Sequence, residues 1–398
     1  MKKVFEESVT LIIPSYKREK YLKRILKYYK DIKIKILIAD SSPKPLENHK
    51  DYNCEYYHYP NMWIFEKLLK IVKKVKTPYL LFCADDDFII ISSVCKCFNF
   101  LEKNNQYSCA DGNYINFNEK NLLKNIYLDL SYNDYNEKDI QKRLFKALTF
   151  NNNRTYVNNF YALHRSNYVV DAFEALDNNG YGKLEKKVSI TPEFTLLFFG
   201  HIKGGYRRLP IFYAARSNGV RMYSNSDIIG WNNMKAEEFN IFKKSISHYI
   251  IKIFNVEKKY AEDSFEKIFN FWVNHFEYLH HIPTVSLSPN SIFQKNGYFK
   301  VIISNFLPNF IKKIVRKILN KIKSLLSKLK IFFYEIFIDS RIERYHLVEN
   351  SKFSYLKLNY IKHCFKRGYP FLIDFKAIYE WNKIKRIIKQ SNSKNISN

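Results

Sequence analysis

Short apolar runs alternate with amphipathic segments along the first hundred residues. Apolar runs at 9–13, 34–39 and 79–83 each end at a proline or a polar turn, which predicts three buried strands. Between them, apolar residues at helical spacing predict helices over 18–30 and 62–76. Because strands that alternate with helices form parallel sheets covered on both faces, the pattern predicts an α/β fold.

Farther along the chain the pattern is mixed and then helical. After residue 217 the strand signals fade and aromatic-rich helical segments dominate, so we place a domain boundary there. The other predicted elements are a strand at 55–59, a strand at 107–110, a loop at 116–135, a helix at 138–150, a strand at 159–164, a helix from 191 and a strand at 208–215. The predicted division is an α/β domain over 1–216, a helical region over 217–300, a basic amphipathic helix over 301–338 and a helical tail over 339–398.

Three aspartates in a row follow the predicted strand at 79–83. Asp85, Asp86 and Asp87 repel one another and raise each other's pKa unless a cation shares the site. Carboxylate oxygens suit Mg²⁺ or Mn²⁺, and parallel sheets bind ligands beyond the carboxyl ends of their strands, where Asp40 also lies. The alternative is a solvated acidic turn that caps a helix beginning near residue 92.

The composition of the chain limits which partners, binding motifs and cellular compartments it suits. With 66 Lys and Arg against 38 Asp and Glu, the formal charge is +28, which favours an anionic partner, although an AT-rich genome gives the same bias. Only 10 glycines occur, and no Gly-rich phosphate loop is present in the sequence. The 6 cysteines form no CxxC pair, which predicts reduced thiols. We expect neither a signal peptide nor a membrane-spanning helix, because the apolar runs are too short.

Three segments in a fixed order carry a resemblance to a known family. LIIPSYKRE, ILIADSS and TPYLLFCADDDF resemble the nucleotide-binding half of family 2-type glycosyltransferases with the GT-A fold, over about residues 8–216 and best over 8–90. The FCADDDF form resembles a bacterial subgroup of surface-glycan transferases. The resemblance implies a Rossmann-like mixed sheet with helices on both faces, a nucleotide-sugar donor and a divalent cation, Mn²⁺ or Mg²⁺.

The resemblance also assigns residues to the donor site. It implies that Asp40 contacts the base or the ribose, and that Asp85 and Asp87 bind the metal and the diphosphate. Ser41 stands where a second acid is common in the family, so the identity of the base stays open. The QxxRW signature of processive enzymes is absent from the sequence, which favours a single addition. The implied nucleotide-sugar residues in this part of the chain are Pro14, Ser15, Tyr16, Arg18, Asp40, Asp85 and Asp86.

An inverting transfer needs a carboxylate that takes the proton of the acceptor hydroxyl. The family places this base at a helix start well after the aspartate motif, and Glu193, beside Thr191-Pro192, fits that place. A helix N-terminus favours the ionised form that a base requires. Glu185 is the rival base, and the alternative for Glu193 is that it only complements the helix dipole.

Three further side chains complete the predicted site. Asp111 is expected to line the sugar pocket, although a turn aspartate explains it almost as well. His201 is a candidate third metal ligand, although a lone histidine is more often structural. Arg216, or one of its neighbours Arg207 and Arg208, would neutralise the leaving diphosphate as charge develops on it.

A basic amphipathic stretch lies toward the C-terminus. Between residues 278 and 334 there are ten Lys or Arg and no Asp or Glu, and the apolar residues over 311–329 follow helical spacing. A helix of this kind is typical of contact with an anionic membrane surface, and the predicted contact covers 311–338. The alternatives are a helix packed on the protein core and nucleic-acid binding. The sequence contains neither an RNP-like motif nor a zinc finger, so we expect no nucleic-acid partner.

Together these features predict a metal-dependent enzyme that adds one sugar, from a UDP-sugar, to a growing bacterial surface glycan or glycolipid. Capsule, lipooligosaccharide and O-antigen are the candidate products. The predicted location is the cytoplasmic face of the bacterial plasma membrane, as a peripheral protein. The rival hypotheses are a sugar nucleotidyltransferase, which would release pyrophosphate, and a basic membrane-associated protein with a degenerate transferase domain.

Overall fold

The computed structural model describes residues 2–118, 127–130, 134–148, 159–184, 191–218, 236–281, 342–346 and 375–393. The chain divides into two compact units. The first consists of Met1–Val273, Ile338–Val348 and Asp374–Asn398, and it contains every strand described below. The second, Asn274–Phe337 with Glu349–Ile373, lies almost wholly outside the described residues.

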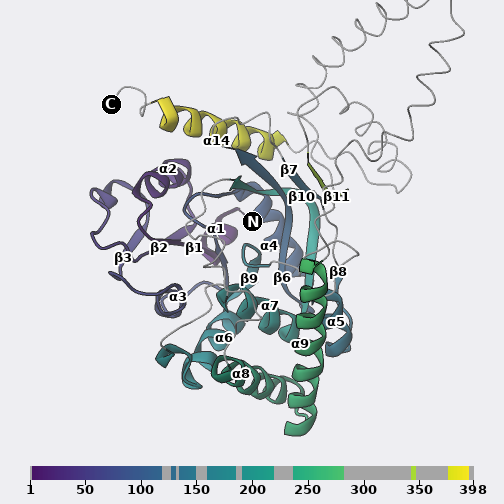
Figure 1. Ribbon diagram of the computed structural model, residues 1–398. Helices are drawn as coiled ribbons and strands as arrows, with labels where there is room; N and C mark the ends of the chain where they lie inside the picture. Colours follow the sequence, from purple (N-terminus) through teal and green to yellow (C-terminus); the bar gives the residue numbers. More distant parts are fainter. Residues whose placement is uncertain are drawn as a thin grey trace, which may run out of the picture. The chain divides into compact units, whose positions relative to one another are not determined.

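Four parallel strands form the first half of a mixed sheet (Figure 1). Their order in space is β3-β2-β1-β4. Because their apolar runs are covered on both faces, β1, β2 and β4 are buried almost throughout, as parallel strands usually are. This confirms the parallel sheet predicted from the alternating pattern. The bounds are β1 (Val9–Ser15), β2 (Lys35–Asp40), β3 (Glu55–His58) and β4 (Tyr79–Phe82).

The second half of the sheet mixes strand directions. β9 lies antiparallel between β4 and β6, while β10 runs parallel to β6 along most of its length. β5 and β8 pair antiparallel with β10, and β7 joins β6 to β11. The loop predicted over 116–135 is therefore wrong in part, because strand pairing occupies some of it. The bounds are β5 (Phe88–Ile89), β6 (Tyr107–Asn118), β7 (Tyr127–Leu130), β8 (Asp134–Tyr135), β9 (Leu163–Arg165), β10 (Gly205–Asn218) and β11 (Ile342–His346).

Helices cover the sheet on both sides (Figure 1). One group joins α2, α4 and α14, and the other joins α3, α6, α7 and α8. Short 3-10 turns lie at η1 (His49–Asp51) and η2 (Tyr181–Lys183). The helix bounds are α1 (Lys2–Ser8), α2 (Glu19–Tyr29), α3 (Ile64–Val72), α4 (Ile91–Lys103), α5 (Ile140–Leu148), α6 (Ser166–Asn178), α7 (Thr191–Lys203), α8 (Ala236–Phe254), α9 (Lys258–His281) and α14 (Phe375–Ser393).

The division of the chain differs from the prediction in two ways. The first compact unit does not stop at residue 216, because α8 packs against α6 and α7 within it. The region predicted as a helical tail over 339–398 contributes β11 to the sheet and places α14 against α2 and α4. Local pattern missed both because the deciding contacts join segments that are distant in the chain. The helix α8 lies tens of residues after α6 and α7, and β11 and α14 lie more than two hundred residues after the strands and helices that they contact.

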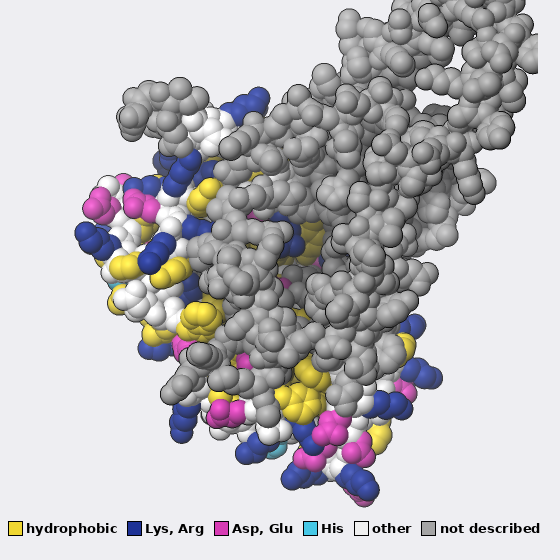
Figure 2. Space-filling view, in the orientation of Figure 1, with side chains coloured by type: hydrophobic (Ala, Val, Ile, Leu, Met, Phe, Trp, Pro, Cys, Tyr) yellow, Lys and Arg dark blue, Asp and Glu magenta, His cyan; other side chains and the backbone are white. Residues whose placement is uncertain are grey.

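The basic stretch over 311–338 lies outside the described residues, so its predicted membrane contact stays a prediction. Among the residues that are described, no helix is long and apolar enough to cross a membrane. On the face shown in Figure 2, the described Lys and Arg side chains are scattered among acidic and apolar ones rather than gathered into one patch. The high positive charge is therefore not concentrated on this face of the described part.

A buried ion pair joins the two long strands of the sheet. Asp111 on β6 accepts hydrogen bonds from Arg208 on β10, with Nε to Oδ1 at 3.0 Å and Nη2 to Oδ2 at 2.9 Å. The hydroxyls of Tyr114 and Tyr206 donate to the same carboxylate at 2.6 and 2.7 Å. The Asp111 side chain is 0% exposed and that of Arg208 is 5% exposed. Both carboxylate oxygens already have protein partners, so the structure favours a structural role for Asp111 over the predicted sugar pocket.

This pair predicts a large stability effect. Asp111→Asn leaves the Arg208 charge buried without its carboxylate, so the free energy of unfolding should fall by about 3–5 kcal/mol in a denaturant titration. The neighbouring pair of Arg207 and Asp134 provides the control, because its side chains are 20% and 29% exposed. Asp134→Asn should cost about 1 kcal/mol or less. Equal losses in the two variants would contradict the assignment of Asp111–Arg208 as a pair that stabilises the core.

Candidate active site

The candidate site lies where β1, β2 and β4 end side by side. The register pairs Ser15 with Asp40, and β4 leads directly through Cys83 and Ala84 into the three aspartates. After β1 the chain turns through Lys17, whose φ is 53°, and enters α2 just after Arg18. The amide of Lys17 donates to Ser42 Oγ at 2.8 Å, which ties this turn to the end of β2. The carboxyl ends of the strands thus form the ligand edge that the sequence predicted.

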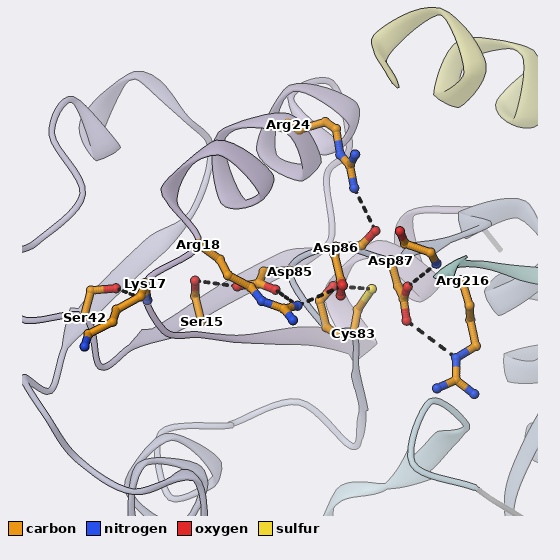
Figure 3. A network of polar contacts seen from close by, with 12 residues as sticks. Ser15, Lys17, Arg18, Arg24, Ser42, Cys83, Asp85, Asp86, Asp87 and Arg216 are labelled. Carbon is orange, nitrogen blue, oxygen red and sulfur yellow. Dashed lines mark hydrogen bonds and ion pairs between the residues drawn. The ribbon is translucent and has the colours of Figure 1, made fainter. Parts of the chain in front are cut away.

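Asp85 and Asp86 share one guanidinium group (Figure 3). Arg18 Nη1 lies 3.2 Å from Asp85 Oδ1 and 2.8 Å from Asp86 Oδ2. The hydroxyl of Ser15 donates to Asp85 Oδ2 at 2.7 Å. The structure therefore brings together four residues that the family resemblance assigned to the donor site, and their role in nucleotide binding stays a prediction.

Asp40 is held in a fixed orientation at the end of β2. Its Oδ1 accepts from the amide of Ser42 at 2.9 Å and from the Ser42 hydroxyl at 2.6 Å, and its Oδ2 accepts from Tyr56 at 2.6 Å. The residue is 2% exposed. Pro14 pairs with Ala39 in the neighbouring strand, and Tyr16 follows in the turn, partly exposed. Both carboxylate oxygens have protein partners, so contact of Asp40 with a base or a ribose stays a prediction.

Asp87 faces away from Arg18, toward β10 (Figure 3). Its Oδ2 accepts from the Tyr161 hydroxyl at 2.6 Å and lies 3.6 Å from Arg216 Nε, while its Oδ1 accepts from the amide of Ser217 at 2.6 Å. Asp85 and Asp87 therefore contact different cations, and Asp85 with Asp86 is the pair that meets at one point. In the described part of the chain, no group of three or more His, Cys, Asp or Glu is arranged to hold a metal.

Burial dominates the electrostatics of the three aspartates. It raises the pKa of Asp85 to about 6, against the opposing effects of Arg18 and Ser15. Burial and the charge of Asp87 raise the pKa of Asp86 to about 6 as well, and burial raises the pKa of Asp87 despite Arg216. One guanidinium does not neutralise the paired carboxylates fully, so their donor set fits an added divalent cation.

Lys67 belongs to the site although sequence reasoning did not select it. Its ammonium donates to the carbonyl of Ser15 at 2.6 Å and to Ser41 Oγ at 3.0 Å, so it joins the ends of β1 and β2. Burial lowers its pKa to about 8, while Asp85 and Asp40 oppose that shift. The available signal was a lysine on the apolar face of an amphipathic helix, since α3 buries it among hydrophobic neighbours.

Arg24 is a second buried cation that the sequence did not reveal. Its Nη2 donates to the carbonyl of Asp86 at 2.9 Å, and its guanidinium lies over the rings of Tyr21 and Phe88. The residue is 1% exposed. It therefore supports the backbone of the aspartate turn from behind, while Arg18 contacts the carboxylates (Figure 3).

Glu193 lies in the first turn of α7 and interacts electrostatically with Arg216. Burial works against the charge of Arg216, but Tyr161, Asp87 and Glu193 outweigh it and raise the pKa of Arg216. The guanidinium also lies 5.3 Å from the centre of the Tyr161 ring. Glu193 thus interacts electrostatically with Arg216, which contacts Asp87, and the role of Glu193 as base stays a prediction. The rival Glu185 lies outside the described residues.

The prediction that His201 completes a metal shell is wrong. His201 is fully buried near the end of α7, where its ring lies 5.8 Å from that of Tyr206 and 5.9 Å from that of Tyr135. Tyr206 begins β10, whereas Ser217, which contacts Asp87, lies at the other end of that strand. Their partners on β6, Cys109 and Phe117, lie eight residues apart, which is roughly 26 Å of strand. Burial also lowers the pKa of His201 to about 4, so the imidazole is neutral and structural.

The buried aspartates predict a pH effect on stability. Because the pKa of Asp85 is raised in the folded state, the folded protein holds this proton more tightly than the unfolded chain. The stabilising effect is complete below the unfolded pKa and disappears as the pH rises through about 6. Asp85→Asn should therefore increase the free energy of unfolding by up to about 3 kcal/mol near pH 7.5.

Denaturant titrations across the pH range measure this effect. The difference between Asp85→Asn and the unmodified protein should shrink toward about pH 4.5, because the aspartic acid is then protonated in the folded state. Asp51→Asn, at an exposed position, is the control for the removal of a carboxylate from the surface. A variant that is less stable than the unmodified protein at every pH would contradict the prediction.

Comparisons with known proteins give a family match in the N-terminal part of the chain. Residues 10–166 match the family model described as glycosyl transferase family 2, a span that contains Ser15, Arg18, Asp40 and Asp85 but not Glu193. A comparison with curated protein sequences gives no match.

Solved structures give weaker likenesses. Among them, S. aureus TarS 1-349 is 10% identical, with a TM-score of 0.42, and the match covers 71% of this chain and 77% of that one. S. aureus TarS 1-349 in complex with UDP-GlcNAc gives 10% identity, a TM-score of 0.42 and coverages of 66% and 72%. This chain spans only 43% of the longer S. aureus TarS structure, at 10% identity and a TM-score of 0.40. These likenesses add nothing to the family match. Residues 10–166, which are less than half of the chain, thus match a glycosyl transferase family 2 domain.

Proposed function

We propose that the chain transfers one sugar from a nucleotide-sugar, most simply a UDP-sugar, to an acceptor hydroxyl. The observation that carries this proposal is the convergence of Asp40, Lys67 and the Arg18-bound pair of Asp85 and Asp86 at one edge of the sheet. An acid with a fixed orientation suits the base or ribose, and the cation and acids beside it suit a metal-bound diphosphate. The residues proposed to bind the base or ribose and those proposed to bind the diphosphate lie on either side of the end of β1, as the two parts of one nucleotide require.

A divalent cation, Mn²⁺ or Mg²⁺, would bind at Asp85 and Asp86 in this proposal. When bound, it would neutralise the donor diphosphate and the charge that develops on the leaving group. Arg18 would keep the two carboxylates oriented, and Arg24 would hold the backbone of their turn. The buried carboxylates, whose pKa values are raised to about 6, favour a cation of this kind.

The acceptor side of the site would lie toward the end of β10. Arg216 is 43% exposed and is anchored by Asp87 and Tyr161, so its guanidinium can meet a leaving diphosphate while its position stays fixed. Glu193 in the first turn of α7 would accept the proton of the acceptor hydroxyl in an inverting transfer. The helix N-terminus stabilises the carboxylate form that such a base needs.

The acceptor class rests on the sequence alone. We propose a growing bacterial surface glycan or glycolipid, such as capsule, lipooligosaccharide or O-antigen, and a peripheral position on the cytoplasmic face of the plasma membrane through residues 311–338. The rival nucleotidyltransferase would release pyrophosphate, so the identity of the released product separates the two reactions. A degenerate, inactive domain would release neither product.

The metal proposal predicts a sharp loss on removing either paired carboxylate. In a panel of nucleotide-sugars assayed for nucleoside diphosphate release, activity should need Mn²⁺ or Mg²⁺ and should disappear in excess EDTA. Asp85→Asn and Asp86→Asn should each lower activity by a factor of about 10² or more, since each removes a metal ligand or its partner. Asp87→Asn should also lose activity, because it releases Arg216.

Asp51→Asn serves as the control for this series, because the position is exposed and outside the site. It should retain full activity with the same metal dependence. Release of pyrophosphate instead of nucleoside diphosphate would overturn the transfer reaction. Full activity of the unmodified protein in excess EDTA would overturn the metal site alone.

The base proposal predicts a split between binding and turnover. Glu193→Gln keeps the size of the side chain but cannot accept the proton, so donor affinity should stay within about twofold while kcat falls by about 10²–10⁴. Calorimetric titration with the donor nucleotide and steady-state kinetics measure the two quantities. Glu185→Gln is the matched comparison and should remain active. If Glu185→Gln loses turnover while Glu193→Gln keeps it, the base is Glu185.

A further inference from the structure

The C-terminal helix α14 reaches the aspartate turn through one carboxylate. Glu380 accepts hydrogen bonds from the Tyr28 hydroxyl at 2.7 Å, the Ile91 amide at 2.8 Å and the Ser92 amide at 3.0 Å. The two amides are the first of α4, and they need an acceptor from outside the helix. Residue 90, at the N-cap of α4, is an isoleucine and makes no side-chain cap bond. Glu380 therefore supplies, from 288 residues away, the cap that the local sequence lacks.

Only three residues separate the aspartates from the start of α4, and the backbone amides of two of them are held by hydrogen bonds. The amide of Ile89 donates to the Tyr29 hydroxyl at 2.9 Å, and that of Ile90 donates to the carbonyl of Tyr213 at 2.8 Å. Tyr28, which donates to Glu380, also has its hydroxyl 3.2 Å from the carbonyl of Ile89. The contacts of Glu380 therefore lie directly behind the turn that carries Asp85–Asp87.

Trp381, the residue after Glu380, packs against β6 and β10, the strands on the far side of the aspartate turn. The ring of Trp381 lies 5.9 Å from that of Phe117 on β6 and 6.0 Å from that of Phe212 on β10. Phe212 also accepts a hydrogen bond at its carbonyl from Ser93 in the first turn of α4. Farther along, β10 carries the residues that hold Asp87. One turn of α14 thus contacts both segments that fix the aspartates.

We propose that Glu380 is a positioning residue for the donor site, so that the C-terminal helix is a working part of the transferase domain. By capping α4 and binding Tyr28, its carboxylate fixes the segment Phe88–Ser92 and, through it, the direction of the Asp85 and Asp86 carboxylates. This inference rests on the proposed function, because it assigns those carboxylates to the metal-bound diphosphate. Glu380 itself contacts neither reacting group.

The test compares two substitutions on the same helix of the full chain. Glu380→Gln keeps the shape of the side chain but removes the charge. Its amide NH₂ group would face one of the three groups that now donate hydrogen bonds to Glu380, so that hydrogen bond is lost. Lys383→Gln is the matched control, because Lys383 Nζ bonds the carbonyl of Tyr28 and Asp31 at 3.2 Å each and anchors α14 to α2 without touching α4. Glu380→Asp, which keeps the charge on a shorter side chain, should fall between Glu380→Gln and the unmodified protein.

Two measurements separate positioning from general stability. In hydrogen–deuterium exchange without donor or metal, Glu380→Gln should speed exchange over residues 84–90, whereas Lys383→Gln should leave that segment unchanged. In transfer assays, Glu380→Gln should raise the half-saturating Mn²⁺ concentration and the donor KM by roughly tenfold, as outer-shell substitutions commonly do. Lys383→Gln should leave both within about twofold.

The outcomes distinguish this inference from the proposed function. If exchange over 84–90 does not change in Glu380→Gln, or if the two variants change it equally, the positioning role is overturned. If Glu380→Gln does not fold, Glu380→Asp carries the same comparison. If exchange changes as expected but the unmodified protein transfers no sugar and binds no Mn²⁺, the contact network stands and the proposed donor site fails.

Discussion

Three consecutive carboxylates are buried at the end of β4, and much of the site exists to make that burial tolerable. Removing ionised carboxylates from water costs several kcal/mol for each unless cations and hydrogen-bond donors replace the solvent. The protein supplies Arg18 and Ser15 on one side and Arg216, Tyr161 and a backbone amide on the other. Burial still raises the pKa of all three aspartates, so the compensation is incomplete.

The compensating groups come from segments far apart in the chain. Ser15 and Arg18 lie about 70 residues before the aspartates, while the amide that meets Asp87 lies 130 residues after it. The sheet makes this assembly possible, because β1 pairs with β4 on one side of the turn and β10 pairs with β5 on the other. Strand order therefore decides which charge each aspartate faces. Asp85 and Asp86 are directed to one cation and Asp87 to another, and a solvated acidic turn would show neither contact.

Several site residues were predictable because their signals are local. An apolar strand that stops at Asp40, or at Asp85, can be read from a dozen residues, and the order of these motifs carries the family resemblance. Lys67 and Arg24 were not predicted as site residues, because a basic residue on an amphipathic helix is usually exposed to solvent, and only the fold shows that these two are buried. His201 and Asp111 were assigned to the site because both types of residue can serve it. The positions of α7 and β10 then paired Asp111 with Arg208 and placed His201 far from the aspartates.

Local sequence patterns were enough to predict the secondary-structure elements and the edge of the sheet where the acidic residues lie. The apolar runs specified β1, β2 and β4, and the positions of Asp40 and Asp85–Asp87 at strand ends followed from where those runs stop. The partners that neutralise each carboxylate, and the end of the α/β unit, became clear from the three-dimensional contacts. These contacts also show that α14 belongs to this unit, through those of Glu380 with α4. The reason is physical: periodicity reports the burial of one segment, whereas charge pairing and capping depend on which distant segments the sheet brings into contact.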